Sequence, residues 1–392
     1  MLRPSQRAGG SKTSPQRSDG QRTWIGFFNG DSLGYNPPDR FFPAEYLDIL
    51  TNPTRIAQTG LDLRPAAAVA LTITLVCCAL APLRAETPAE PIRLTGEIYR
   101  GEDLSAIVAI GQFLVIGSDE GSRIQILEPD ETPGSYRPRE TPIQLLRGDQ
   151  EIDIEAMAFA DGVLYVLGSH SIKRKLIDPD GEYVENRALL ETVSPEPHRK
   201  KLFRVEVDEE SGLLASTIDV VSLETVLKED PVLGPFTRIP AVENGVNIEG
   251  LAADGRMLYL GFRSPVLREG YVPVMLMRFD KPEDHELRFV RLKGSGVRSL
   301  ARVADGFLVL AAPERGAETQ SAIYHWNGLD QVPGAGKRQG RVERLLELAP
   351  VRGGTPEGLT VVAEREDYYE VIVVHDGIPG GHPLRLRVPR PR

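Results

Sequence analysis

The sequence predicts an all-β protein that folds as a single β-propeller of five blades, with six blades as the alternative. Three observations support this prediction. A short motif with a glutamate after a turn-type residue occurs three times, at residues 153–156, 247–250 and 355–358. The same frame recurs without the glutamate at 103–106 and 296–299. The copies at 103–106, 153–156, 247–250 and 296–299 each open a hairpin whose first strand is rich in small residues and whose second strand is rich in bulky ones.

These hairpins have the taper expected of propeller blades. Their Asp-Gly or Gly turns supply the positive φ that a tight hairpin requires. Small residues suit the innermost strand, which lines the central channel, and bulky residues suit the layer outside it. Marker positions lie at 105, 155, 249, 299 and 357. Three of the four intervals are close to 50 residues, a period that fits a four-stranded blade.

The long interval between the second and third markers predicts an insertion. It contains an irregular stretch at 171–199 and a short predicted helix near 222–228. If about 50 residues are insertion, one blade remains, and its outer strands are predicted at 201–207 and 213–218. If the interval instead holds a further blade, the count is six.

The last blade is predicted from strands at 357–363, 369–375 and 384–388. A strand at 92–99 has no hairpin partner of its own. Pairing it with 384–388 would close the ring and remove both open edges. The propeller domain is therefore predicted to span residues 92–388.

The segment before the propeller has the pattern of a secretory signal. Residues 66–83 carry no charge and lie between Arg64 and Arg84, and Ala85 precedes a polar stretch with prolines. Small residues at such a point are typical of a cleavage site. We assign 65–85 to a signal peptide. The alternative is a membrane anchor, because the apolar run approaches the minimum of about 17 residues that spans a bilayer.

Residues 1–64 are unusual before a signal peptide, which ordinarily starts a few residues ahead of its apolar run. Their Gly, Ser, Pro and Arg content predicts disorder, and the alternative is a misassigned start, with translation from near Leu61 or Leu63. Cleavage after Ala85 would remove both cysteines, Cys77 and Cys78. We expect a periplasmic or secreted monomer that needs no disulfide and has no membrane association after cleavage.

Charge and motifs limit the classes of function. The formal net charge is -10, and Lys and Arg form no basic stripe, so we expect no nucleic-acid partner. The sequence contains none of the common short motifs for serine hydrolases, zinc proteases, thiol redox centres, phosphate loops or dinucleotide binding. Whether the protein is an enzyme stays open, with a phosphoesterase or other hydrolase as the candidate.

Blade geometry brings separated residues to one face of the ring. The start of a blade's first strand and the end of its second strand share a face, and we expect the site there, at the channel mouth. The candidate metal ligands are Asp153, Glu155, Asn247, Glu249 and Glu357. The candidate ligand-binding residues are His170, Lys173, Arg174, Arg263, Arg298, Asp119 and Glu120.

Carboxylates that converge on one mouth repel each other unless a positive charge offsets them. Calcium suits several carboxylates with an amide oxygen, and the basic side chains would hold an anion such as phosphate beside it. The alternative interpretation is structural. The glutamates then cap backbone N–H groups of the neighbouring blade or pair with Arg263 and Arg298, and Lys173 and Arg174 lie in a solvated loop.

Over about residues 92–388, the chain resembles a family of bacterial secreted propellers of unknown function. The resemblance rests on Asp153-Ile-Glu155, Gly168-Ser-His170-Ser with Lys173-Arg174, Asn247-Ile-Glu249-Gly-Leu, Gly261-Phe-Arg263-Ser-Pro265, Gly296-Val-Arg298-Ser-Leu and Pro356-Glu357-Gly-Leu. The chain departs from the pattern at Ala156, where glycine is usual, and in its long amino-terminal tail.

That family is similar to the phytase-like, esterase-like propellers, which share Glu-Gly repeats. That relation implies phosphate esters and calcium. From the charges of the mouth we expect an exported module that binds a small anionic molecule or an envelope component, with calcium. The alternative is a calcium-dependent phosphoesterase or esterase of the phytase-like type.

Overall fold

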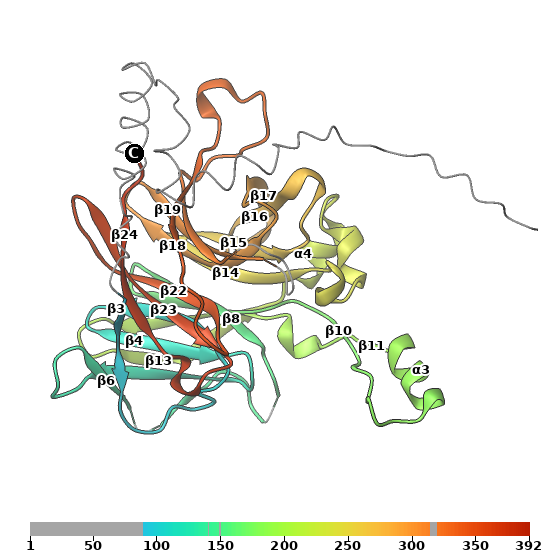
Figure 1. Cartoon of the computed structure of the whole chain (residues 1–392), viewed down its shortest axis with the longest axis horizontal. Coiled ribbons are helices and arrows are strands. Elements are labelled where there is room, and N and C mark those ends of the chain that lie inside the picture. The colour runs from blue at the N-terminus through green and yellow to red at the C-terminus, as the bar shows by residue number, and fades with distance from the viewer. Residues whose placement is uncertain (1–88, 140, 149, 314–319) are drawn as a thin grey trace, which may run out of the picture. The chain divides into compact units, whose positions relative to one another are not determined.

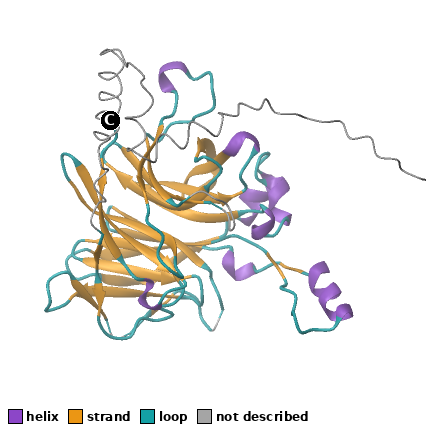
Figure 2. Cartoon of the chain, viewed as in Figure 1, coloured by secondary structure: helices purple, strands orange, loops and turns teal. Residues whose placement is uncertain are grey.

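The computed structural model forms a single β-propeller of five blades (Figure 1), built almost entirely from strands (Figure 2). It describes residues 89–392 except 140, 149 and 314–319. The five-blade prediction is confirmed, and the long interval holds an insertion, not a sixth blade. The predicted extension at 1–64 and signal peptide at 65–85 lie outside the described residues.

The blades follow one another along the chain. Blade 1 contains β3 (Leu104–Ile110), β4 (Phe113–Ser118) and β5 (Arg123–Pro129), and β5 pairs with β6 (Ser135–Pro138) and β7 (Ile143–Gln144). Blade 2 contains β8 (Ile154–Ala160), β9 (Val163–Gly168), β12 (Leu202–Asp208) and β13 (Leu213–Val221). Blade 3 contains β14 (Asn247–Asp254), β15 (Met257–Ser264), β16 (Tyr271–Arg278) and β17 (Lys281–Arg291). Blade 4 contains β18 (Gly296–Val303), β19 (Gly306–Ala312), β20 (Ala322–Trp326) and β21 (Val342–Glu347). Blade 5 contains β22 (Thr355–Glu364), β23 (Tyr368–Asp376), β24 (Leu384–Pro389) and β1 (Glu90–Pro91).

The innermost strands pack side by side in a closed ring, in the order β3, β8, β14, β18, β22 and back to β3. Small residues are required where these strands approach each other. A Cβ atom added to Gly250 of β14 would lie 2.7 Å from Cγ1 of Val297 on β18, closer than two carbon atoms can stably approach. The small-inside, bulky-outside pattern of the sequence therefore has a steric cause.

The ring closes through a segment earlier than the predicted strand at 92–99. Strand β1 pairs antiparallel with β24, with Glu90 opposite Arg385, and the Ile92 N–H donates to the Pro383 carbonyl at 2.8 Å. The chain then turns away, and β2 (Arg93–Leu94) runs parallel to β6 in blade 1. The amino-terminal segment thus joins the last blade to the first, because the buried Ile92 side chain belongs to the core between them.

The insertion in blade 2 forms an arm and a helix. Two short strands, β10 (Lys173–Arg174) and β11 (Val193–Ser194), carry α3 (Tyr183–Glu191) away from the sheets (Figure 1). The predicted helix near 222–228 is confirmed as α4 (Glu224–Glu229). Helix α3 lies in the stretch predicted to be irregular. It buries no residue, so the sequence offers no apolar face to indicate it.

Candidate functional site

Near the start of each innermost strand, one residue is skipped in the pairing with the second strand of its blade. These five residues, called the bulge residues below, are Ser105, Glu155, Glu249, Arg298 and Glu357. A β-bulge leaves the extra residue unpaired and re-aims its side chain. The sequence spacing predicts Ser299 as the fourth marker. The residue at the bulge is instead Arg298, because the register shift falls between Val297 and Ser299.

Arg298 joins two of the bulge glutamates. Its Nη1 donates to Glu249 Oε2 at 3.1 Å and to Glu357 Oε1 at 2.6 Å. All three residues are at least nine-tenths buried. Burial opposes the charge of Arg298, but Glu249 and Glu357 raise its pKa above the usual value. Arg298 therefore stays a cation and holds two blades to the third at the channel mouth.

Glu249 has two further partners. Asn247 Nδ2 donates to Glu249 Oε1 at 2.7 Å, and Arg263 Nη1 donates to the same oxygen at 3.0 Å. Asn247 is 4% exposed, and its Oδ1 has no hydrogen-bond partner among the described residues. The alternative interpretation expected the glutamates to pair with Arg263 and Arg298. Glu249 pairs with both arginines, and Glu357 pairs with Arg298.

Two serines of the inner strands, and not the glutamates, make hydrogen bonds to the backbone of the neighbouring blade. Ser105 Oγ donates to the Ile154 carbonyl of the next blade, and Ser299 Oγ accepts from the Leu359 N–H at 3.1 Å. No hydrogen bond from a described backbone N–H reaches the carboxylates of Glu155, Glu249 or Glu357. The glutamates are therefore not explained as caps.

Glu155 differs from the other bulge residues. Within the described part of the chain, no hydrogen bond or ion pair reaches its carboxylate. Loss of hydration raises its pKa well above the usual value, and the charges of Glu249, Asp153 and Glu357 raise it further. Burial likewise raises the pKa of Glu357 to about 8, although Arg298 opposes the shift. The mouth therefore holds more carboxylates than its arginines offset.

A cavity of about 420 Å³ opens at this position. Its charged lining consists of Asp119, Glu155, Glu249, Glu357 and Asp376 with Arg263 and Arg298, a formal charge of 2−5=−3. Leu348, Pro350 and Val351 give the cavity an apolar portion of wall. The lining therefore combines acidic and apolar residues.

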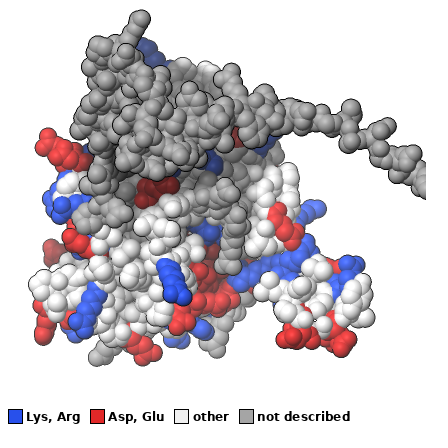
Figure 3. All heavy atoms as spheres, in the orientation of Figure 1, with Lys and Arg blue, Asp and Glu red and all other residues white. Residues whose placement is uncertain are grey.

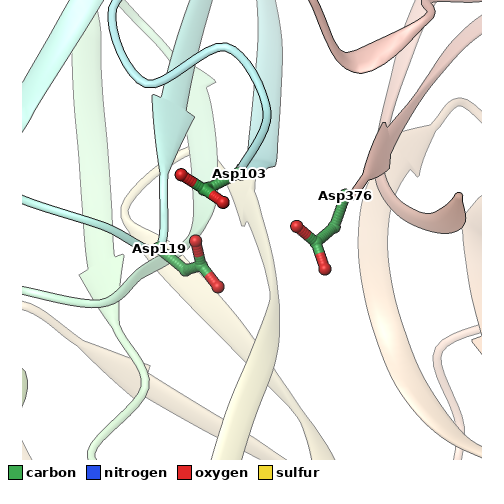
Figure 4. Close-up of side chains that lie close together, drawn as sticks. All are labelled: Asp103, Asp119 and Asp376. Atoms are coloured by element: carbon green, nitrogen blue, oxygen red, sulfur yellow. The ribbon is translucent and has the colours of Figure 1, made fainter. Parts of the chain in front are cut away.

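Three aspartates gather beside the bulge residues, at the end of blades 1 and 5 (Figure 4). Asp103, Asp119 and Asp376 each place a carboxylate oxygen within 4.8 Å of the other two. Burial raises the pKa of Asp119 to about 7, and the charges of Asp376 and Asp103 add to the shift. The Asp119 Oδ1 atom is buried without a hydrogen-bond partner. This is the group of described residues whose oxygens lie closest to the arrangement that a metal ion requires.

Asp153 belongs to a separate buried cluster. Arg199 contacts both Asp153 and Glu151, and Ser171 Oγ donates to Asp153 Oδ2 at 3.4 Å. Burial raises the pKa of Asp153 to about 8. Neither Asp153 nor Asn247 lines the cavity, whereas Glu155, Glu249 and Glu357 do. Three of the five predicted metal ligands are therefore brought together at the cavity.

The predicted ligand-binding residues separate in the same way. Arg263, Arg298 and Asp119 line the cavity, and Glu120 is an exposed neighbour. His170 is 4% exposed; its Nδ1 lies 2.8 Å from the Gly168 carbonyl and its Nε2 accepts from the Leu223 N–H at 3.4 Å. Burial lowers the pKa of His170 to about 4. Its contacts are those of a neutral histidine that fixes the turn after β9.

Lys173 and Arg174 lie at the root of the arm. Lys173 Nζ is 3.2 Å from Glu151 Oε1, and its charge lowers the pKa of Asp119, so it lies on the mouth side. Arg174 Nη2 donates to Glu243 Oε2 at 3.0 Å. Both side chains have structural partners and do not line the cavity.

Two residues of the mouth, Asp103 and Asp376, and one of the Asp153 cluster, Arg199, were absent from the predicted sets. Asp376 ends β23, and the shared-face argument collects it although it is not among the candidate ligands; Asp103 opens the first copy of the motif, so the same argument could have included it. Arg199 could not be found in this way, because it lies in the insertion, 46 residues from Asp153.

The fold and site define a five-bladed propeller with an acidic cavity at one end of its channel. A family model described as "Protein of unknown function (DUF3616)" matches residues 103–382. The chain therefore belongs to this family. No curated protein matches the chain. Within the described residues, the helices are too short and too polar to cross a bilayer.

Three solved structures are similar to the chain. The extracellular domain of the putative one component system BT4673 from B. thetaiotaomicron is 13% identical, with a TM-score of 0.29, over 77% of this chain and 30% of that one. The computationally designed Ika4 protein is 14% identical, with a TM-score of 0.26, over 59% of this chain and 96% of that one. Bacteroides ovatus Xyloglucan PUL GH43B is 13% identical, with a TM-score of 0.36, over 78% of this chain and 54% of that one. The chain thus spans less than a third of the first of these proteins.

Proposed function

We propose that the channel mouth binds calcium together with a small anionic molecule or an anionic group of an envelope component. The observation that carries this proposal is the Glu155 carboxylate. It lines the cavity beside Glu249 and Glu357 and has no hydrogen-bond partner in the described chain. The Glu155 side chain is partly buried, and a partly desolvated carboxylate without a partner favours protonation or a nearby cation.

The donor set fits calcium. Calcium takes six to eight oxygen ligands and accepts carboxylates with amide oxygens in flexible geometry. Glu155, with Glu249 and Glu357 beside it in the cavity lining, offers one position. Asp103, Asp119 and Asp376 offer an adjacent one, where three oxygens lie within 4.8 Å. Calcium would supply positive charge to the acidic wall and an attachment point for an anion.

The anion binds only after calcium, because the cavity without a cation carries a net negative charge and would repel it. Arg298 is buried by its two glutamates, whereas the Arg263 side chain is 19% exposed and lines the cavity. A phosphate or carboxylate would contact calcium and the guanidinium of Arg263, which also donates to Glu249, at the same time. The apolar wall would then contact the remainder of such a molecule.

Phosphate titrated by calorimetry tests the two components together. We expect phosphate to bind when calcium is present and to bind negligibly in chelator. Arg263→Met should weaken phosphate binding, whereas Arg338→Met, at an exposed position in a 3-10 turn, should not. Equal phosphate binding with and without calcium would contradict the proposal.

Export belongs to the same proposal, because extracellular calcium suits weak sites with dissociation constants of about 10⁻⁴–10⁻³ M. It is motivated by the apolar segment that ends at Ala85. Mass spectrometry of protein from periplasm or medium should find an amino terminus near Glu86. Recovery of the whole chain from the cytoplasm would contradict export.

A calcium-dependent phosphoesterase of the phytase-like kind is the second candidate. It is favoured by Asp119, because a carboxyl with a pKa of about 7 suits general acid or base catalysis near neutral pH. A screen of phosphate esters and lactones, with and without calcium, separates the candidates. Turnover that calcium activates and Asp119→Asn abolishes would favour the enzyme, and absence of turnover would favour binding alone.

A further inference from the structure

The arm at residues 173–194 is ordered but does not pack against the propeller. Helix α3 buries no residue. Six of the eleven exposed large apolar residues of the described chain lie in its outer part, residues 176–193, called the arm tip below. They are Leu176, Ile177, Tyr183, Val184, Leu190 and Val193. Exposed apolar residues gathered in this way mark an interaction site.

The arm holds its shape without the propeller core. The Asp178 N–H donates to Asn186 Oδ1 at 2.8 Å, and Asn186 Nδ2 returns a bond to the Asp178 carbonyl at 2.7 Å. Arg174 ties the root to Glu243 and to the Leu190 carbonyl. A segment that is fixed internally and presents apolar side chains outward loses little entropy when it binds.

Charge indicates the chemistry of the partner. The arm tip carries one arginine and five carboxylates, a formal charge of 1−5=−4. Arg187 pairs with Glu191 at 2.9 Å, and no ion pair with a described residue reaches Asp178, Asp180, Glu182 or Glu185. In Figure 3 the arm, at lower right, shows red side chains along its outer edge and blue ones where it joins the propeller.

From these observations we infer that the arm tip docks a protein partner whose surface offers an apolar groove edged by lysine or arginine. Such a groove covers the apolar side chains and offsets the four carboxylates. A second copy of the chain would bring two tips of the same charge together, and an anionic membrane would repel the tip. Both are disfavoured by the charge.

The position of the arm connects this partner to the channel mouth. Lys173, at the arm root, pairs with Glu151 and acts electrostatically on Asp119. A protein held by the arm tip would therefore lie beside the cavity. In this respect the inference rests on the proposed function, since the partner would present or receive the anionic group that the mouth binds.

Site-specific photo-crosslinking of the full chain in its native cells tests the inference. A photoreactive residue replaces Tyr183, which is 76% exposed, and a control replaces Val332, which is 44% exposed and lies in blade 4. We expect the photoreactive residue at position 183 to give one discrete adduct with another protein, and we expect the residue at position 332 not to give this adduct. Its cross-linked peptide should be apolar and flanked by lysine or arginine.

Variants then establish what holds the adduct. Asp180→Lys with Glu185→Lys should abolish it, and Val184→Ser should reduce it at least about tenfold, if the residue contributes as a central contact does. All three sites are exposed, so the melting temperature and any calcium-dependent shift should stay those of the wild type. That readout separates loss of the partner from loss of the calcium site.

An adduct with a second copy, with lipid, or with the same protein from both positions would overturn the inference. Absence of any adduct, or an adduct that survives the charge reversal, would overturn it as well.

Discussion

Arg298→Met is the perturbation that tests the organisation of the mouth most severely. Arg298 donates to Glu249 at 3.1 Å and to Glu357 at 2.6 Å, and the three residues are 5%, 2% and 9% exposed. Removing one partner of a buried ion pair leaves an uncompensated charge and costs about 3–5 kcal/mol. We expect a loss in this range in the free energy of unfolding, measured by urea denaturation at pH 8 in chelator.

The matched control is Arg302→Met, on the same strand. The Arg302 side chain is 33% exposed and lies 3.3 Å from Asp254, so its loss should cost about 0–1 kcal/mol. Arg298→Lys keeps the charge but not the planar fork, and should recover part of the loss. Calcium should stabilise Arg298→Met, because the cation can replace the missing charge between the glutamates. Equal losses for Arg298→Met and Arg302→Met would refute the reasoning.

Three further predictions concern the turn after β9, the ring closure and the channel wall. Burial lowers the pKa of His170 in the folded protein to about 4, whereas its pKa in the unfolded chain is near 6.5, so neutral His170 stabilises the fold fully above pH 6.5 and this stabilisation is lost as the pH falls toward 4. Urea denaturation across pH 4–7 should show that the free energy of unfolding falls by about 3 kcal/mol from this cause in the wild type and that this part of the fall is absent in His170→Asn. Ile92→Ala should cost about 2–4 kcal/mol in thermal or chemical denaturation because the side chain is 6% exposed, whereas Ile177→Ala, at 50% exposure in the arm, should cost almost nothing, and equal effects would contradict the closure. Gly250→Ala, on the inner strand β14, should destabilise by about 1–3 kcal/mol because its Cβ would lie 2.7 Å from Val297, and a neutral result would show that the inner strands are less crowded than described.

The blades were predictable because their cause is local and repeated. Small residues in the first strand and bulky residues in the second recur along the chain, with Gly turns in the first four blades, and the close approach at Gly250 explains the small residues. The sequence predicted that an amino-terminal strand closes the ring against the last blade, but not which residues form that strand. The two residues of β1 carry no strand pattern, and only the tertiary pairing of Glu90 with Arg385 defines them.

The glutamates of the mouth were predictable because one frame repeats around a ring. The partners were not. Arg298 occupies the position that spacing assigned to Ser299, since a bulge shifts the register by one residue and no sequence pattern shows the shift. His170 appeared as a ligand because a histidine at a strand end suits a site, but its contacts to Gly168 and Leu223 depend on the fold.

The most direct measurement for the calcium site is the melting temperature of the protein in calcium and in chelator. A ligand that binds only the folded state at a hundredfold excess over its dissociation constant stabilises by about 2.7 kcal/mol, which is about 5 °C for a domain of this size. We expect this rise in the wild type and in Glu185→Gln, which alters an exposed carboxylate of the arm. Glu155→Gln should reduce the rise sharply, and Glu249→Gln should blunt it. Identical melting curves for the wild type in calcium and in chelator would contradict the calcium site.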